Sequence, residues 1–254
     1  MVGGKKLITE IREAVAELKE VYGTCSLKLG TEAEANTFED IEYMHKNLGD
    51  IIPIIVKVGG CEAKNDIRKM SEIGVTGIVG PMIESPYALK IYFNTLKAYY
   101  EDLSTVQKII NIESINAFEN LGKILSAPEF DMVDQVTIGR SDFSASLGLH
   151  VDDSKVYDFV REIVNACHKA GKITSVGGGI TPSNALKIKD YIGTEKINIR
   201  TAVIELSKCP DIFVAIKKCL ELEILILKNN MKVFPQYTPY FANRIGVIKE
   251  RIAC

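Results

Sequence analysis

Two stretches of the sequence decide the fold: VQKIINIESINAFENL (residues 106–121) and MVDQVTIGRSDFSASLG (residues 132–148). Each begins with an apolar, β-branched run that is typical of a buried strand, Val106–Ile112 in the first and Val133–Ile138 in the second. Glu113 follows the first run, and Asp142 follows the second. If the two strands are parallel neighbours, both acids emerge at the same edge of the sheet. Two hard oxygen ligands placed there suit a Mg²⁺-type ion. The alternative is that each acid only stabilises the first turn of the next helix.

Strands and helices alternate along the rest of the chain. The pattern predicts a helix over residues 6–22 and then strands at 24–29, 51–58, 75–79, 106–112, 133–138, 172–176 and 196–199. This βαβ rhythm favours a TIM-type (β/α)8 barrel, with an open doubly wound sheet as the alternative. The first strand of such a barrel is missing or atypical. Either the N-terminal residues or another segment therefore closes the barrel, or it stays open.

The chain is expected to divide into a barrel domain at residues 1–210 and a helical extension at residues 211–254. Within the extension, LELEILIL (residues 220–227) alternates like a strand, but it lies in a long run without turn residues. We therefore expect helix there. The extension carries more apolar side chains than the exterior of a barrel needs.

Composition restricts the class of protein. The chain has 254 residues, 46% of them hydrophobic, and a net charge of −2. Such a chain lacks the basic field that a nucleic acid or an anionic membrane would recognise. The six cysteines form no CxxC pair, which is typical of reduced thiols in an intracellular protein. No signal peptide or bilayer-length apolar run is recognisable, so a cytoplasmic location is expected.

The barrel prediction gathers polar and charged residues at one mouth, because the C-terminal ends of parallel strands lie together. These residues are Glu32 or Glu34, Lys57, Glu84, Glu113, Asp142, Gly177–Gly179 and Arg200.

Three segments resemble one known family: IVKVGGCEAKNDIRKMSEIGVTGIVGPMIES, IINIESINAFENLGKIL and VDQVTIGRSDFSASLG. They are similar to the HpcH/HpaI aldolase and citrate lyase β-subunit family, over a region from about Leu27 to Arg200. The NIES and IGRSD segments are the most specific. The resemblance implies a (β/α)8 barrel that binds pyruvate-like or phosphoenolpyruvate-like 2-oxo acids. Its metal-dependent members make or break carbon–carbon bonds with Mg²⁺, Mn²⁺ or Co²⁺, and by this match Glu113 and Asp142 are the metal ligands.

The resemblance also implies roles for other residues. Lys57 stands where the family's aldolases usually carry an arginine that anchors the substrate carboxylate, although it can also be a solvated lysine at a strand end. The backbone of Gly139, Arg140 and Ser141 could hold the same carboxylate.

The family's Glu-His pair is represented only by an acidic loop without a histidine. Glu32 is the first match to the family glutamate for proton transfer, and Glu34 is the next. The loop can equally serve only to cap the helix that starts near Thr37. His150 follows the Gly148 turn and could approach the mouth.

These features predict a divalent-metal-dependent carbon–carbon lyase or aldolase that acts on a small 2-oxo acid or its aldol adduct. Because a C-terminal helix of this family often packs on a neighbouring subunit, a homo-oligomer is expected. One alternative is a phosphosugar isomerase or synthase, which the glycine turn Gly177–Gly179 and Arg200 would suit. The other is a non-catalytic barrel used for assembly, since the histidine is absent and lysine replaces arginine.

Overall fold

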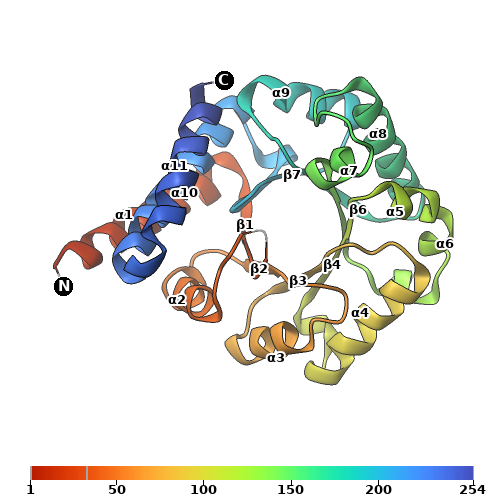
Figure 1. Cartoon of the computed structure of the whole chain (residues 1–254), viewed down its shortest axis with the longest axis horizontal. Helices are drawn as coiled ribbons and strands as arrows, with labels where there is room; N and C mark the ends of the chain where they lie inside the picture. Colours follow the sequence, from red (N-terminus) through yellow and green to blue (C-terminus); the bar gives the residue numbers. More distant parts are fainter. Residues whose placement is uncertain (1, 33, 254) are drawn as a thin grey trace.

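Eight strands form a closed barrel with a surrounding layer of helices (Figure 1) in the computed structural model, which describes residues 2–32 and 34–253. The strands follow one another around the barrel in chain order. Their bounds are β1 Thr24–Gly30, β2 Ile54–Lys57, β3 Gly77–Gly80, β4 Gln107–Ile112, β5 Gln135–Gly139, β6 Ile173–Gly177, β7 Lys196–Ile199 and β8 Ala202–Glu205. The TIM-type barrel prediction is confirmed.

The last strand closes the barrel in an unusual direction. Strands β1 to β7 pair in parallel, whereas β8 is antiparallel to both β7 and β1. A two-residue turn, Arg200–Thr201, reverses the chain between β7 and β8, and Arg200 has a φ of +37°. The sequence did not identify the segment that closes the barrel, and the structure shows that this segment is the short strand β8. Because the turn follows β7, it places Arg200 at the same mouth as the other strand ends.

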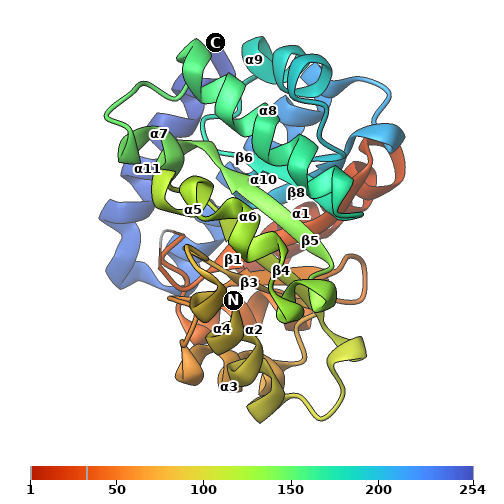
Figure 2. The same ribbon diagram turned by 90° about the vertical axis from the view of Figure 1, so that its right-hand side faces the viewer.

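The helices form the outer layer (Figures 1 and 2). Their bounds are α1 Val2–Tyr22, α2 Phe38–Leu48, α3 Lys64–Ile73, α4 Pro86–Tyr99, α5 Ile115–Glu119, α6 Leu121–Leu125, α7 Arg140–Ser146, α8 Ser154–Lys169, α9 Pro182–Lys187, α10 Ile212–Val233 and α11 Thr238–Ala253. The chain between β4 and β5 forms two short helices, α5 and α6, in place of one long helix. The segment LELEILIL is helical, as expected, and lies within α10.

The C-terminal region belongs to the barrel instead of standing apart from it. Helix α10 packs against α1 and α9, and it also contacts β7. Its buried side chains, among them Ile216, Leu220 and Ile226, join the same apolar core as those of the strands. The boundary predicted at residue 210 therefore does not separate two cores. Helix α11 packs against α10.

The interior of the barrel is apolar on one side and polar on the other. Ile55, Val79, Ile109 and Val203 form a small apolar cluster. Strands β5, β6 and β7 contribute polar side chains that are hydrogen-bonded to one another. Lys196 Nζ donates to Gln135 Oε1 at 2.8 Å, and Gln135 Nε2 donates to Ser175 Oγ at 3.1 Å. The Thr137 and Ser175 hydroxyls lie 2.7 Å apart. Side chains thus fill the barrel below the mouth, as in other barrels of this size.

The structure also bears on the expectations for the cysteines and for membrane-spanning segments. The five cysteines among the described residues are free thiols, whereas Cys254 and Ala33 lie outside those residues. No helix within residues 2–32 and 34–253 is both long enough and apolar enough to cross a bilayer.

Candidate active site at the barrel mouth

A cavity of about 400 Å³ opens where the parallel strands end. Strand-end residues line it, including Lys57 of β2, Gly139 of β5 and Gly177 of β6. Helix α11 adds Arg244 and Arg251 to the lining. A concave site with convergent charged groups at this end of a barrel is the usual location of an active site.

Glu113 lies directly after β4 and is buried, with 1% of its surface exposed. Its carboxylate accepts hydrogen bonds from Lys57 Nζ (3.3 Å), Asn111 Nδ2 (3.0 Å) and the backbone N–H of Met82 (3.1 Å). Asn111 precedes it by two positions, so both side chains point to the same face of the strand. Gly139 provides the space, because a Cβ there would lie 2.6 Å from Glu113 Oε2. The Glu113 carboxylate is therefore fixed in one position.

Asp142 lies in the first turn of α7, and its side chain is half exposed. Its Oδ2 lies 4.0 Å from Lys57 Nζ, and the same ammonium is 3.3 Å from both oxygens of Glu113. The two acids that follow neighbouring strands in the sequence thus face one point at the mouth. The cavity also includes the glycine turn Gly177–Gly179, so all these groups lie at one rim.

The donor set fits a divalent cation. Two carboxylates converge on the space that the Lys57 ammonium fills, and Asn111 Oδ1 is buried beside them without a hydrogen-bond partner among the described residues. Within the same residues no group of three or more His, Cys, Asp and Glu side chains is arranged to hold a metal. Water and substrate would therefore have to complete a coordination sphere of oxygen atoms.

Lys57 lies inside this acidic pair. Its side chain is 13% exposed, and its ammonium contacts Glu113 and Asp142. Lys57 therefore neutralises both acids in this structure, and a divalent cation would compete with it for the same oxygens.

The acidic loop after β1 places Glu34 at the cavity and Glu32 outside it. Glu34 forms an ion pair with Lys28 of β1, and both side chains are less than 10% exposed and line the cavity. Burial raises the pKa of Glu34, but the charge and hydrogen bond of Lys28, together with the charges of Arg200 and Lys57, outweigh burial, so the net pKa is below the ordinary glutamate value. Glu32 is exposed and lies against Gly59. The geometry therefore does not support the proton-transfer role predicted for Glu32.

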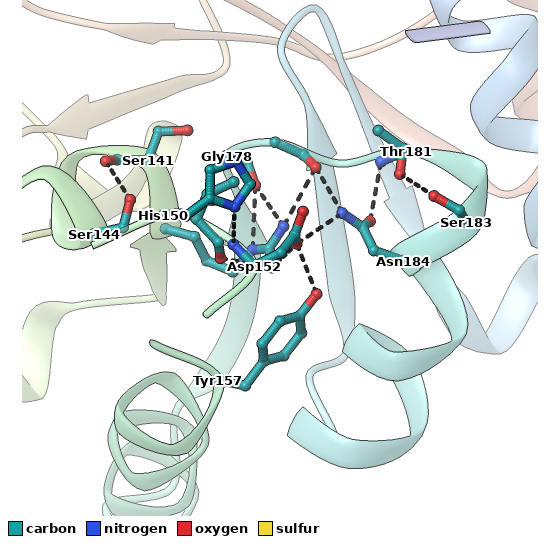
Figure 3. Close-up of polar contacts among 12 residues, drawn as sticks. Ser141, Ser144, His150, Asp152, Tyr157, Gly178, Thr181, Ser183 and Asn184 are labelled. Atoms are coloured by element: carbon teal, nitrogen blue, oxygen red, sulfur yellow. Dashed lines mark hydrogen bonds and ion pairs between the residues drawn. The ribbon is translucent and has the colours of Figure 1, made fainter. Parts of the chain in front are cut away.

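Arg140, which the sequence predicts at the substrate carboxylate, does not line the cavity. The side chain is fully buried and donates to the carbonyl oxygens of Gly178 (2.8 Å) and Gly179 (3.4 Å). It also contacts Asp152 and lies over the ring of Tyr157. Figure 3 shows the Tyr157 hydroxyl donating to Asp152 beside Gly178. The guanidinium group therefore ties the β5–α7 loop to the β6–α9 loop and does not line the cavity, whereas Gly139 and Ser141 do.

Two neighbouring polar residues complete this network. Asn184 Nδ2 donates to Gly179 O at 2.8 Å and to Asp152 Oδ1 at 3.2 Å (Figure 3). His150 is exposed, and its ring nitrogen accepts the backbone N–H of Asp152. His150 supports the loop and does not line the cavity.

The comparison with protein families decides the classification. The profile of the HpcH/HpaI aldolase/citrate lyase family matches residues 49–180, just over half of the chain. The protein belongs to the HpcH/HpaI aldolase/citrate lyase family. Family membership supports an aldolase-type or lyase-type activity on small molecules. The matched region contains Lys57, Glu113 and Asp142, and it ends directly after the glycine turn. None of the curated proteins compared with the chain matches it.

Solved structures of HpcH/HpaI proteins share the fold. A family protein from Burkholderia cenocepacia is 16% identical, with a TM-score of 0.58, over 73% of this chain and 91% of its own. An HpcH/HpaI aldolase from Desulfitobacterium hafniense is also 16% identical, with a TM-score of 0.57 over 74% and 80%. The citrate synthase SbnG is 16% identical, with a TM-score of 0.56 over 72% and 88%. At this identity the likeness establishes the barrel and not the substrate.

Sequence reasoning missed several residues of this site, among them Lys28, Asn111 and the two arginines of α11. Arg244 and Arg251 line the cavity although they lie far along the chain from the family's motifs. Their spacing of seven residues was the available signal, because it places both on one face of a helix. Nothing in the sequence showed that this face would lie at the barrel mouth.

Proposed function

We propose that the protein is a divalent-metal-dependent carbon–carbon lyase or aldolase that acts on a small 2-oxo acid, such as oxaloacetate or pyruvate, or on its aldol adduct. The observation that carries the proposal is the convergence of Glu113 and Asp142 on one point at the mouth. Mg²⁺, Mn²⁺ or Co²⁺ is the proposed cofactor, with these two side chains as its protein ligands. When bound, such a cation supplies Lewis-acid stabilisation of the negative charge on an enolate oxygen.

Lys57 and the β5–α7 loop are proposed to orient the 2-oxo acid. Once a divalent cation balances Glu113 and Asp142, the Lys57 ammonium is available to pair with the substrate carboxylate. Gly139 and Ser141 line the cavity beside the acids, so their backbone can approach the same carboxylate. A lysine offers a point charge instead of a planar fork, so the backbone has to supply the directional contacts.

Proton transfer is assigned to the Lys28–Glu34 pair in place of Glu32, because that pair lines the cavity. In oxaloacetate decarboxylation the C3–C4 bond breaks, the C4 carboxylate leaves as CO₂, and the bonding electrons form the C2–C3 enolate. A proton from the Lys28 ammonium to C3 then gives pyruvate. In aldol cleavage, the Glu34 carboxylate accepts the hydroxyl proton of the adduct as the aldehyde forms.

Oxaloacetate decarboxylation tests the proposed function. Pyruvate formation is followed with Mg²⁺ or Mn²⁺ and with EDTA, and the rate of an enzyme-free sample is subtracted. We expect metal-dependent activity that Glu113→Gln reduces by at least about a hundredfold, as for loss of other strong electrostatic contacts in active sites. Glu119→Gln, on the exposed face of α5, is the matched control and should not change the rate. Equal activity in EDTA would contradict the proposal.

The expectation of a homo-oligomer is kept as part of the proposal. Apolar side chains of the C-terminal helical region are exposed, including Tyr237, Tyr240 and Val247. Exposed apolar groups on one segment are typical of a contact with another protein surface.

A further inference from the structure

Three arginines line one part of the cavity: Arg200 from the β7–β8 turn, and Arg244 and Arg251 from α11. The two residues of α11 are seven positions apart, which places them on one helix face, two turns from each other. The acids Glu113 and Asp142 follow β4 and β5 instead. The cavity therefore has an acidic part and a basic part that different elements build.

The basic part has more positive than negative charge. Glu223 of α10 is the carboxylate that pairs with it: Arg244 Nε donates to Glu223 Oε1 at 2.9 Å, and Arg200 Nε lies 3.7 Å from the same oxygen. Glu223 is itself buried, with 2% of its surface exposed. Glu34 also lines the cavity and acts on Arg200, but it is already paired with Lys28, so Arg244 and Arg251 still leave excess positive charge facing the cavity.

Arg251 has unused hydrogen-bonding capacity at this place. Its Nη2 donates to the backbone oxygen of Ile180, which is neutral, and its Nε is buried without a hydrogen-bond partner among the described residues. Burial lowers the pKa of Arg251; Glu223 opposes this shift, and the charges of Arg244 and Arg200 add to it. Like charges that act on one another in a partly dehydrated place are unfavourable, and an anion would relieve the repulsion.

We propose that Arg244 and Arg251, with Arg200, bind a second anionic group of the substrate, a phosphate ester or a carboxylate, at the end away from the reacting carbon. The planar fork of arginine matches both groups through paired N–H···O hydrogen bonds. The inference rests on the proposed function for the identity of the first group, the 2-oxo acid at Glu113 and Asp142. A substrate with charged groups at both ends would be oriented by the two parts of the cavity.

The glycine turn is a poorer candidate for the same anion. The carbonyl oxygens of Gly178 and Gly179 face the Arg140 guanidinium, and Asn184 donates to Gly179 as well. Helix α9, which follows the turn, has only six residues. The phosphate site that the sequence suggested at this turn is therefore better placed at the arginines.

Calorimetric titration with inorganic phosphate and with succinate, both in EDTA, tests the inference without any metal. At least one of the two anions should bind the wild-type protein, and the tighter one identifies the chemistry of the second group. Arg251→Gln should weaken that binding by about tenfold or more, as expected for loss of a charge-assisted contact. Arg251→Lys should lose less affinity for the anion than Arg251→Gln, because lysine keeps the positive charge. Arg68→Gln, an exposed arginine of α3 outside the cavity, is the matched control.

Absence of binding by both anions, or equal binding by the wild type and Arg251→Gln, would overturn the inference. A separate titration of the wild type with Mn²⁺ and oxalate distinguishes this failure from failure of the proposed function. Anion binding without Mn²⁺–oxalate binding would overturn the proposed function and support the arginine site. Mn²⁺–oxalate binding without binding of phosphate or succinate would overturn only the arginine site.

Discussion

At the scale of single residues, Lys57 bears on both functions proposed for the mouth, which are binding of the metal ion and binding of the substrate carboxylate. Its ammonium lies 4.0 Å from Asp142 and 3.3 Å from Glu113. It therefore occupies the position from which a divalent cation would contact both carboxylates. The same ammonium is proposed to pair with the substrate carboxylate.

Replacing Lys57 by Met should tighten the binding of Mn²⁺ to the substrate-free protein. The substitution removes a cation that competes for Glu113 and Asp142, and at an effective dielectric constant of about 20 a unit charge at ~4 Å contributes ~4 kcal/mol. Even a third of this energy gives about a tenfold lower Kd. Calorimetry measures the Kd, with Lys90→Met on the exposed side of α4 as the control. Weaker Mn²⁺ binding by Lys57→Met would show that Lys57 does not compete for these acids.

Replacing one member of the buried Lys28–Glu34 ion pair should lower the free energy of unfolding substantially. Lys28→Met or Glu34→Gln leaves one member of the pair buried without its partner, which costs about 3–5 kcal/mol. The double variant should recover much of this loss. Urea unfolding of the four proteins gives the coupling free energy, and additive losses in the double variant would contradict the pairing.

The pH dependence of this pair follows from the pKa of Glu34. Because the folded-state pKa lies below the ordinary value of 4.5, the stabilisation is complete above 4.5 and is lost as the pH falls through the folded-state pKa. The difference in stability between the wild type and Glu34→Gln should therefore be full at neutral pH and shrink in acid.

The positions of site residues were predictable where a strand end fixed them. Glu113 follows its apolar run directly, and Asp142 follows its own in the first turn of the next helix, so the parallel sheet brings both to one rim. Glu32 and Glu34 are only two positions apart in a loop, and the course of the loop decides which of them faces the cavity. Ala35 has a φ of +56° there, and no residue pattern announces such a turn.

At the scale of elements, the β5–α7 and β6–α9 loops are interlocked. Gly178 has a φ of +87°, and a Cβ on it would lie 2.4 Å from Ser141 N and 3.0 Å from Arg140 N. The Arg140 side chain then binds the carbonyl oxygens of Gly178 and Gly179 from behind. The backbone of residues 139–141 is therefore held beside the acids by the neighbouring loop.

Gly178→Ala should damage both stability and activity. The substitution adds a methyl group against the backbone of Ser141 and forces a non-glycine residue into the left-handed region, a combined cost of about 1–3 kcal/mol. Thermal unfolding and the decarboxylation rate measure the two effects. Gly60→Ala is the control, because a Cβ there meets no atom within 4 Å. Unchanged activity of Gly178→Ala would contradict the role given to this contact.

The sequence showed seven strands and missed the eighth. Strand β8 has only four residues, and its turn contains Arg200 and Thr201 in place of the glycine or asparagine typical of hairpins. Its antiparallel direction also lies outside the βαβ rhythm that revealed the others. Tertiary pairing with β1 and β7 creates this strand, so local patterns could not predict it.

At the scale of the whole molecule, the C-terminal helices contribute both to the outer layer of the barrel and to the lining of the cavity. Helix α10 completes the outer layer, and α11 carries Arg244 and Arg251 to the mouth. The same region leaves Tyr237, Tyr240 and Val247 exposed. The core could be predicted as a barrel from periodicity, whereas the placement of α11 depends on packing between distant segments.

We expect Tyr237→Asp to reduce the oligomeric state. A charge introduced at a contact between subunits remains unpaired when buried, which is strongly unfavourable. Light scattering coupled to size-exclusion chromatography measures the molecular mass of each protein. Tyr87→Asp, on the exposed start of α4, is the control and should keep the wild-type mass. A wild-type protein that is monomeric at all concentrations would contradict the expectation of a homo-oligomer.

Direct titration of Mn²⁺ is the measurement that bears most closely on the metal-dependent aldolase or lyase proposed for this barrel. Calorimetry on the wild type, Glu113→Gln, Asp142→Asn and Glu119→Gln compares the two converging acids with an acid outside the cavity. We predict one Mn²⁺ per chain for the wild type and for Glu119→Gln, and a loss of affinity of at least about tenfold for each of the other two variants. Undiminished binding in both Glu113→Gln and Asp142→Asn would contradict the account.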